Sequence, residues 1–124
     1  MRWYMPVVFA GVIFASTVLQ GSTVASACMN LDKLLHVGAY GGMAALVLMA
    51  LHRPDRPLSW KAVLLAVLIS NAYGILEEYH QSFVPGRVPS GDDMLANLVG
   101  TVLGSGWYLV VSHRWPWIAQ LLGR

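Results

Sequence analysis

The sequence has little charge and almost no cysteine, and both shortages exclude classes of protein. Only 11 % of its 124 residues are charged, whereas a soluble domain typically carries about 25 %. The hydrophobic share is 56 %, which leaves too few polar side chains to cover a globule in water. A single cysteine, Cys28, excludes an intrachain disulfide, and no Cys/His spacing typical of zinc sites occurs. The net charge of +2 is too small to indicate a nucleic-acid partner. Length and composition indicate one membrane domain over residues 1–124.

Four apolar runs are present, each long enough to cross a bilayer, which takes about 20 helical residues. They cover residues 3–20, 32–51, 60–81 and 93–112, and the connections between them are short. The sequence therefore predicts an all-α fold, an integral membrane bundle of four transmembrane helices. Trp115 and Trp117 in the tail are typical of residues at a membrane interface.

The first run is open to a second interpretation. Arg2, an apolar stretch and then "ASAC" are similar to a signal peptide, so that cleavage after Ala27 or lipidation at Cys28 would leave three helices. Ala25, however, occupies a position where a lipoprotein signal usually has Leu or Val, and the run is long enough to span. The four-helix bundle is therefore the preferred interpretation.

Basic residues are divided unequally between the two ends of this bundle. The amino end, the second loop and the tail carry six Lys or Arg and one Asp, a net charge of +5. The opposite end carries two basic and five acidic residues, a net charge of −3. Because positive charge favours the cytoplasmic side, we expect both termini in the cytoplasm and the acidic end outside.

Helical spacing predicts a polar cluster at that outer end, because residues three or four apart share a face. The three polar faces comprise Asp32, His36 and Tyr40 in the second helix, Asn71, Gly74, Glu78 and Gln81 in the third, and Asp93, Asn97, Gly100 and Gly104 in the fourth. The first helix contributes almost nothing polar. Polar groups below a membrane surface are costly and are candidates for function.

Three further expectations follow from the same helical faces. Glu77 and His80 are expected to point away from the cluster and to be solvated or interfacial. Gly38 and Gly42 form a small-xxx-small pair that is expected to pack closely on a neighbouring helix. "VPGR", residues 84–87, is typical of a tight turn.

The cluster contains residues suited to catalysis and to binding. The catalytic candidates are Asp32, His36, Glu78 and Asp93, and the binding candidates are Lys33, Tyr40, Gln81, Arg87 and Asn97. Asp32 could orient the His36 imidazole as an acid/base pair, and Arg87 could hold a phosphate or carboxylate. No cofactor is evident, although Glu78 or Asp93 could bind a divalent cation. The alternative is that Asp32 and the Asp92–Asp93 pair only cap helices.

These motifs resemble those of the VanZ-like membrane protein family. The resemblance rests on "DKLLHVGAYGGMA" and "EEYHQSFVPGRVPSGDDMLANLVGTVLG" and covers roughly residues 30–108. The shared pattern falls on Asp32, Lys33, His36, Glu78, Gln81, Pro85, Gly86, Arg87, Asp93, Asn97 and Gly100. The family's founding member is an accessory protein of glycopeptide resistance associated with teicoplanin. The resemblance therefore implies a bacterial cell-envelope protein of the cytoplasmic membrane and does not imply a reaction.

Two functional hypotheses are compatible with the sequence. In the first, the protein binds or processes a lipid-linked or glycan cell-wall precursor at the outer leaflet, and it is an enzyme only if the acidic and imidazole groups act on that substrate. In the second, it is a non-enzymatic membrane scaffold or binding protein whose polar cluster is a structural network. The lipid bilayer is a partner in both, and the oligomeric state is open.

Overall fold

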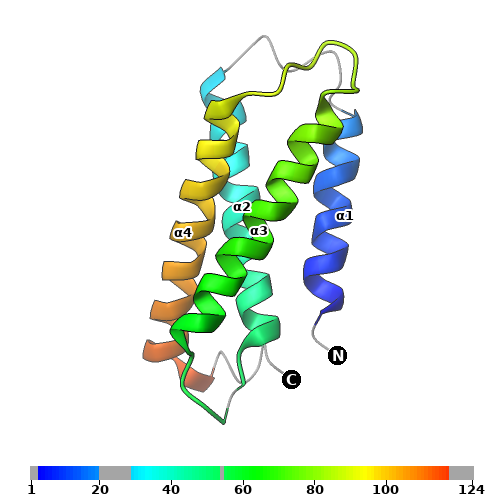
Figure 1. Cartoon of the computed structure of the whole chain (residues 1–124). Helices are drawn as coiled ribbons and strands as arrows, with labels where there is room; N and C mark the ends of the chain where they lie inside the picture. The colour runs from blue at the N-terminus through cyan, green and yellow to red at the C-terminus, as the bar shows by residue number, and fades with distance from the viewer. Residues whose placement is uncertain (1–2, 20–28, 54, 118–124) are drawn as a thin grey trace.

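The computed structural model describes residues 3–19, 29–53 and 55–117, and within these ranges it contains four helices and no strand. The helices are α1 (Tyr4–Leu19), α2 (Met29–Leu51), α3 (Trp60–Gln81) and α4 (Gly91–Arg114). They run alternately up and down, so the start of α1 and the end of α4 lie at one end of the bundle (Figure 1). The predicted all-α bundle is confirmed.

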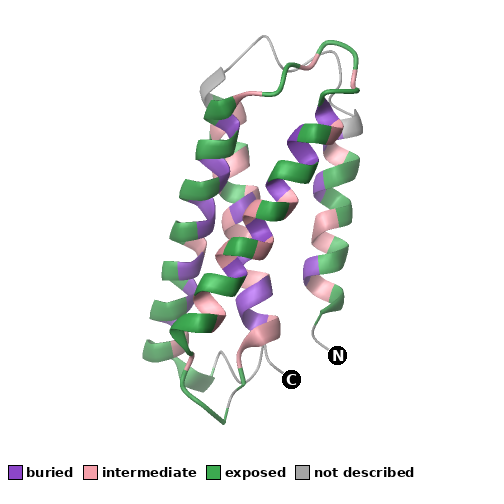
Figure 2. Ribbon diagram, in the orientation of Figure 1, coloured by how far each residue is buried: buried purple, intermediate pink, exposed green. Residues whose placement is uncertain are grey.

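Three of the described helices are long and apolar enough to cross a membrane, namely Leu31–Leu51, Trp60–Gln81 and Gly91–Arg114. At a rise of about 1.5 Å per residue, the 22 residues of α3 extend about 33 Å, close to the roughly 30 Å of a hydrocarbon core. The 16 residues of α1 form a shorter apolar helix. The outward-facing sides of the helices are largely exposed (Figure 2). Many of the exposed residues are large and apolar, including Leu68, Leu95 and Val102, as expected for side chains that face lipid.

Serine residues begin two of the helices. The Ser59 hydroxyl accepts from the Ala62 amide at 3.2 Å, and the Ser90 hydroxyl accepts from the Asp92 amide at 3.2 Å. These bonds satisfy amide groups that the first helical turn leaves without partners. The N-cap of α4 is therefore Ser90 and not Asp92 or Asp93, and the helix begins two residues earlier than predicted. Asp32 likewise lies inside the first turn of α2, which begins at Met29.

A glycine contact brings α2 and α4 together over much of their length. A Cβ atom at Gly104 would overlap the backbone of Gly41, and one at Gly100 would overlap the backbone of Val37. The expected glycine face on α4 is thus confirmed, but its partner on α2 is Gly41. Gly38 was expected to make such a contact and has open space around it.

The other predicted glycine of α2 packs on α1. A Cβ atom at Gly42 would lie 3.2 Å from Cζ of Phe9. Because positions 41 and 42 are about 100° apart on the helix, α2 can contact α4 and α1 at the same level. This places α2 at the centre of the described bundle, and its residues Tyr40, Val47 and Leu48 are almost fully buried.

The connection between α3 and α4 closes the end of the bundle at which α2 and α4 begin, which we call the polar end. The Arg87 amide donates to the Val84 carbonyl at 3.1 Å, and Gly86 has φ of 84°. This is a tight turn with Pro85 and Gly86 at its centre, and its second central position favours glycine. The turn predicted from "VPGR" is confirmed, and it positions Arg87 over the helices. The proposed processing sites at Ala27 and Cys28 lie outside the described residues.

Candidate functional site

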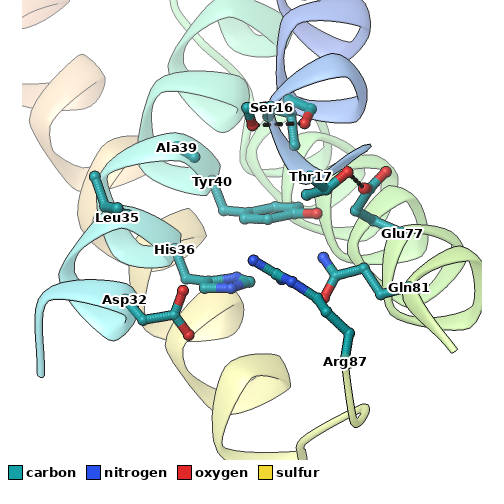
Figure 3. Close-up of a pocket in the computed structure, with 11 residues that line it drawn as sticks. Ser16, Thr17, Asp32, Leu35, His36, Ala39, Tyr40, Glu77, Gln81 and Arg87 are labelled. Atoms are coloured by element: carbon teal, nitrogen blue, oxygen red, sulfur yellow. Dashed lines mark hydrogen bonds between the residues drawn. The ribbon is translucent and has the colours of Figure 1, made fainter. Parts of the chain in front are cut away.

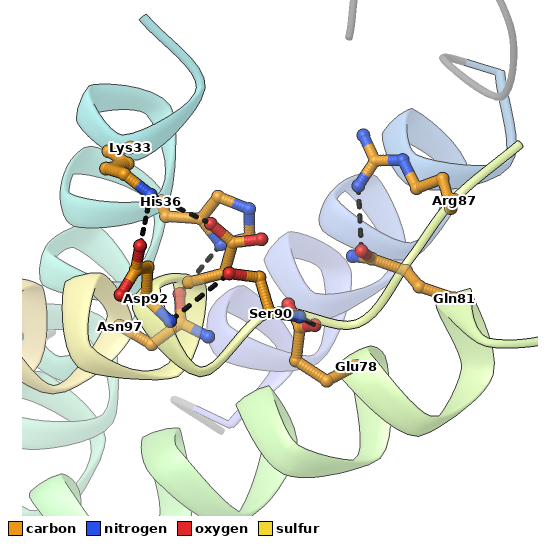
Figure 4. Close-up of polar contacts among 9 residues, drawn as sticks. Lys33, His36, Glu78, Gln81, Arg87, Ser90, Asp92 and Asn97 are labelled. Atoms are coloured by element: carbon orange, nitrogen blue, oxygen red, sulfur yellow. Dashed lines mark hydrogen bonds and ion pairs between the residues drawn. The ribbon is translucent and has the colours of Figure 1, made fainter. Parts of the chain in front are cut away.

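A pocket of about 230 Å³ lies at the polar end between α1, α2 and α3 (Figure 3). Apolar and polar side chains both line it: Ile13, Ser16, Thr17, Asp32, Leu35, His36, Ala39, Tyr40, Glu77, Gln81 and Arg87. Five of the nine predicted site residues are in this lining. The other four, Lys33, Glu78, Asp93 and Asn97, lie outside this lining, and Figure 4 shows Lys33 and Asn97 beside His36.

Arg87 is the cationic group of the pocket. Its Nη1 donates to Oε1 of the buried Gln81 at 2.7 Å, which fixes the guanidinium between α2 and α3 (Figure 3). No carboxylate of the described residues lies within ion-pair distance of it. The Arg87 Nε atom is buried and, among the described residues, has no hydrogen-bond partner. The guanidinium is therefore held in place while part of its donor capacity is unused.

The His36 imidazole is oriented by α4. Its Nδ1 lies 2.8 Å from Oδ1 of Asn97, whose side chain is 2 % exposed. Sequence reasoning assigned this orienting role to Asp32, and the structure assigns it to Asn97. Since an amide oxygen can only accept, the bond places a proton on Nδ1, and in the neutral imidazole Nε2 then carries the lone pair.

Tyr40 lies one helical turn beyond His36 and is almost fully buried, at 1 % exposure. The two rings are nearly parallel, with 3° between their planes and 6.3 Å between their centroids. The Tyr40 hydroxyl has no hydrogen-bond partner among the described residues. Its ring forms part of the pocket floor, which Figure 3 shows beside Arg87 and Gln81.

The acidic residues near α4 are held in different ways. Lys33 Nζ lies 3.5 Å from Asp92 and 3.8 Å from Asp93, so its charge is shared between an exposed and a buried carboxylate. Glu78 is 4 % exposed, and one of its oxygens accepts from the Ser90 amide at 3.3 Å. Its other oxygen, Oε1, is buried and lacks a partner in the described part of the chain. Figure 4 shows Lys33, Glu78 and Asn97 converging from three helices.

Glu77 was expected to be solvated, and this expectation is wrong. The side chain is 3 % exposed, accepts a hydrogen bond from the Thr17 hydroxyl, and lies 3.4 Å from the Tyr73 hydroxyl. The i, i+4 spacing of Tyr73, Glu77 and Gln81 was the signal that could have placed it on the pocket face.

The first helix also contributes more than expected. Thr17 and Ser16 line the pocket, and the Tyr73 hydroxyl donates to the Ala10 carbonyl at 2.6 Å. His80 is half-buried, with its ring 4.5 Å from that of Phe14. These polar contacts on α1 were missed because its sequence contains no charged residue after Arg2.

A metal ion could be held where α2 meets α4. Potential ligand atoms of Asp32, His36 and Asp93 all lie within 4.8 Å of one another. No nucleophile–base pair accompanies them among the loop serines. The Ser82 hydroxyl donates to the Tyr79 carbonyl at 2.6 Å, and the Ser90 hydroxyl caps α4. The arrangement is suited to binding an anion at Arg87 and a cation at the carboxylates.

Comparison with known proteins gives a family but no individual relative. A family model described as VanZ/LLP1 matches residues 3–112. No curated protein and no solved structure matches the chain. The matched segment includes α1, and it is therefore longer than the segment covered by the motifs alone, roughly residues 30–108.

Proposed function

The chain belongs to the VanZ/LLP1 family, and on that premise we propose that it is a multi-pass protein of the bacterial cytoplasmic membrane that binds the anionic headgroup of a lipid-linked cell-wall precursor. The observation that carries this proposal is the Arg87 guanidinium, held by Gln81 and without a carboxylate partner among the described residues. A guanidinium presents paired donors that fit phosphate and carboxylate oxygens.

The other residues of the pocket supply what a lipid headgroup needs. His36, Gln81 and Tyr40 add polar atoms around the guanidinium. Ile13, Leu35 and Ala39 add apolar surface on the α1 and α2 sides. A ligand with an anionic head and an apolar chain would contact both the polar and the apolar surface of this pocket. A free inorganic anion would contact only the polar surface.

The depth of the pocket also supports a headgroup ligand. Asp32 and His36 are the fourth and eighth residues of α2, and Gln81 ends α3. At about 1.5 Å per residue, Asp32 and Gln81 lie within about 5 Å of the helix ends, whereas His36 lies about 11 Å and Tyr40 about 17 Å from the start of α2. The polar headgroup layer is about 5–7.5 Å thick on each side of a bilayer, since the total thickness is about 40–45 Å and the hydrocarbon core about 30 Å. The outer part of the pocket would therefore lie at the depth of a headgroup and its inner part at the depth of the apolar chain.

The distribution of basic residues supports an outward-facing pocket. Arg53, Arg56, Lys61 and Arg114 lie at the end opposite the polar end. Basic residues near helix ends favour the cytoplasm, so both termini are proposed to be cytoplasmic. The precursor is then met at the outer leaflet, and altered teicoplanin susceptibility, which the family resemblance suggests, is the proposed consequence.

The binding role is tested by removing the guanidinium. Purified protein in nanodiscs should bind a polyprenyl phosphate more tightly than the uncharged polyprenol. Arg87→Ala should weaken binding of the phosphate by about tenfold or more, because charge-assisted hydrogen bonds contribute about 1.5–3 kcal/mol. The affinity of Arg87→Lys for the phosphate should lie between those of wild type and Arg87→Ala, since lysine keeps the charge but not the paired donors. Native mass spectrometry or fluorescence quenching measures the affinity.

Arg56→Ala is the matched control, because Arg56 is exposed and lies at the opposite end, where it pairs with Asp55 at 3.7 Å. Equal affinity of wild type and Arg87→Ala for the phosphate would overturn the proposal. The structural-network hypothesis makes the opposite prediction, because it requires Arg87→Ala to lower the melting temperature and the amount of protein in the membrane. The contacts that favour that hypothesis are Lys33–Asp93 and Asn71–Thr101.

A further inference from the structure

The geometry points to a divalent-cation site formed by Asp32, His36 and Asp93, which adjoins the Arg87 anion site in the same pocket but does not use the guanidinium. The potential ligand atoms of these residues all lie within 4.8 Å of one another. Atoms that bind one transition-metal ion at about 2.0–2.2 Å lie roughly 3–4 Å apart. Small side-chain rotations therefore suffice to bring the three groups onto one ion.

The fold itself brings the three groups together. Asp32 and His36 are four residues apart on α2, which places them on one face. Asp93 lies in the first turn of α4. The close approach of Gly100 and Gly104 to the α2 backbone sets the distance between these helices and so carries Asp93 to the Asp32–His36 face.

The hydrogen bond from His36 is the kind that supports metal ligation. Histidines that bind metals usually donate their second ring N–H to a carbonyl or carboxylate, which fixes the tautomer and the ring plane. Asn97 Oδ1 lies 2.8 Å from Nδ1 of His36 and supplies that acceptor from a position that is 2 % exposed. The Nε2 lone pair is then available to a cation.

The charges around the site are not balanced by the described residues. Asp93 and Glu78 are 8 % and 4 % exposed, and burying a carboxylate is costly unless it is paired. Lys33 is shared with the exposed Asp92. Glu78 lies close enough to Asp93, His36 and Arg87 to interact with them electrostatically. Its buried Oε1 has no hydrogen-bond partner among the described residues, which leaves one acceptor atom beside the site for a cation or for a water molecule bound to it.

The ligand set indicates the class of ion. Two carboxylates and one imidazole suit a first-row transition ion such as Mn²⁺ or Zn²⁺. Ca²⁺ takes six to eight oxygen ligands and is not matched by this set. Three protein ligands leave open positions for water or for a ligand oxygen, as in catalytic rather than structural zinc sites.

The test uses the purified full chain in nanodiscs and Mn²⁺, which is detected by electron paramagnetic resonance. Wild type should bind one Mn²⁺ per chain, Zn²⁺ should displace it, and a nitrogen hyperfine coupling should report the imidazole. Asp32→Asn and His36→Gln should each weaken Mn²⁺ binding at least tenfold. His36→Gln should also abolish the nitrogen coupling.

Asp92→Asn is the matched control, because this neighbouring side chain is 77 % exposed, and it should bind Mn²⁺ as wild type does. Asp32→Asn is the variant that tests the cation site if the other variants fold poorly. Asp32 is only half-buried and lies at a helix end, so its substitution should leave the fold intact. Unchanged Mn²⁺ binding in Asp32→Asn, or the absence of any saturable Mn²⁺ binding in wild type, would overturn the proposal. Arg87→Ala should keep the metal and lose only the polyprenyl phosphate, which separates this proposal from the proposed function.

Discussion

Glu77 shows how the chemistry of single residues holds the pocket together. Its carboxylate is buried at the junction of α1 and α3 and accepts a hydrogen bond from Thr17. A carboxylate that loses a partner in such a place retains its desolvation cost without compensation. The bond between Thr17 and Glu77 is therefore expected to attach the shorter α1 to the rest of the bundle.

Replacing Thr17 by valine tests that attachment, because valine has nearly the same shape but no hydroxyl. Thr17→Val should destabilise the protein by about 1–3 kcal/mol, the usual effect of leaving a buried acceptor without its donor. The measurement is the melting temperature of the purified protein in detergent, together with protease sensitivity of α1.

Thr17→Ser and Ser16→Ala serve as controls for this experiment. Thr17→Ser keeps a hydroxyl and should retain most of the stability. Within the described part of the chain, the Ser16 hydroxyl bonds only to the Ile13 carbonyl of its own helix at 2.7 Å, so Ser16→Ala should have little effect. A Thr17→Val protein as stable as wild type would show that the hydrogen bond does not hold α1.

Among the elements, α2 and α4 form the tightest pair because glycine lets their backbones meet. Gly41 faces Gly100 and Gly104 directly, and a Cβ atom at Gly41 would lie 3.1 Å from the Gly100 carbonyl oxygen. Small residues at such contacts are typical of helix pairs in membranes, where dispersion contacts replace the hydrophobic effect. This pair positions Asp93 and Asn97 beside His36, so the packing of the helices sets the geometry of the site.

Adding one methyl group at the contact should disrupt it. Gly104→Ala places a Cβ on the Gly41 backbone, which cannot rotate away as a side chain can. We expect a destabilisation of about 1–3 kcal/mol, as for other overpacked cores, and loss of both Mn²⁺ and headgroup binding. Thermal melting and the two binding assays measure these effects.

Gly106→Ala, two residues along the same helix, is the matched control. A Cβ there has nothing within 4 Å, and alanine has the higher helix propensity, worth up to about 1 kcal/mol. Gly106→Ala should therefore be neutral or stabilising. If Gly104→Ala were equally well tolerated, the close contact between α2 and α4 would not be needed for stability.

At the scale of the whole molecule, charge is separated along the axis of the bundle. The acidic residues other than Asp55 lie at the polar end, whereas four of the six described Lys and Arg residues lie at the other. A reporter enzyme that is active only outside the cytoplasm tests the orientation. Fused after Ser90, it should be active, and fused after Arg56 it should be inactive, because positive charge is retained in the cytoplasm. The reverse pattern of activity would invert the proposed topology.

The sequence by itself determined the class of molecule and the position of its polar groups along each helix. Runs of about 20 apolar residues predict spans, and a period of 3.6 predicts which residues share a face. Asp32, His36 and Gln81 were assigned to one polar cluster on these grounds, and Arg87 was assigned to it from its position in the loop between two of the helices. Pro85 and Gly86 likewise predicted the turn, because their backbone preferences are local.

Only the tertiary structure decided which faces meet. Periodicity orients residues within a helix but contains no information on its rotation against a neighbour. For that reason Gly41 and not Gly38 contacts α4, Asn97 and not Asp32 orients His36, and Glu77 is buried rather than solvated. Each of these outcomes depends on how closely backbones approach, which is set by all of the packed side chains together and not by any one segment.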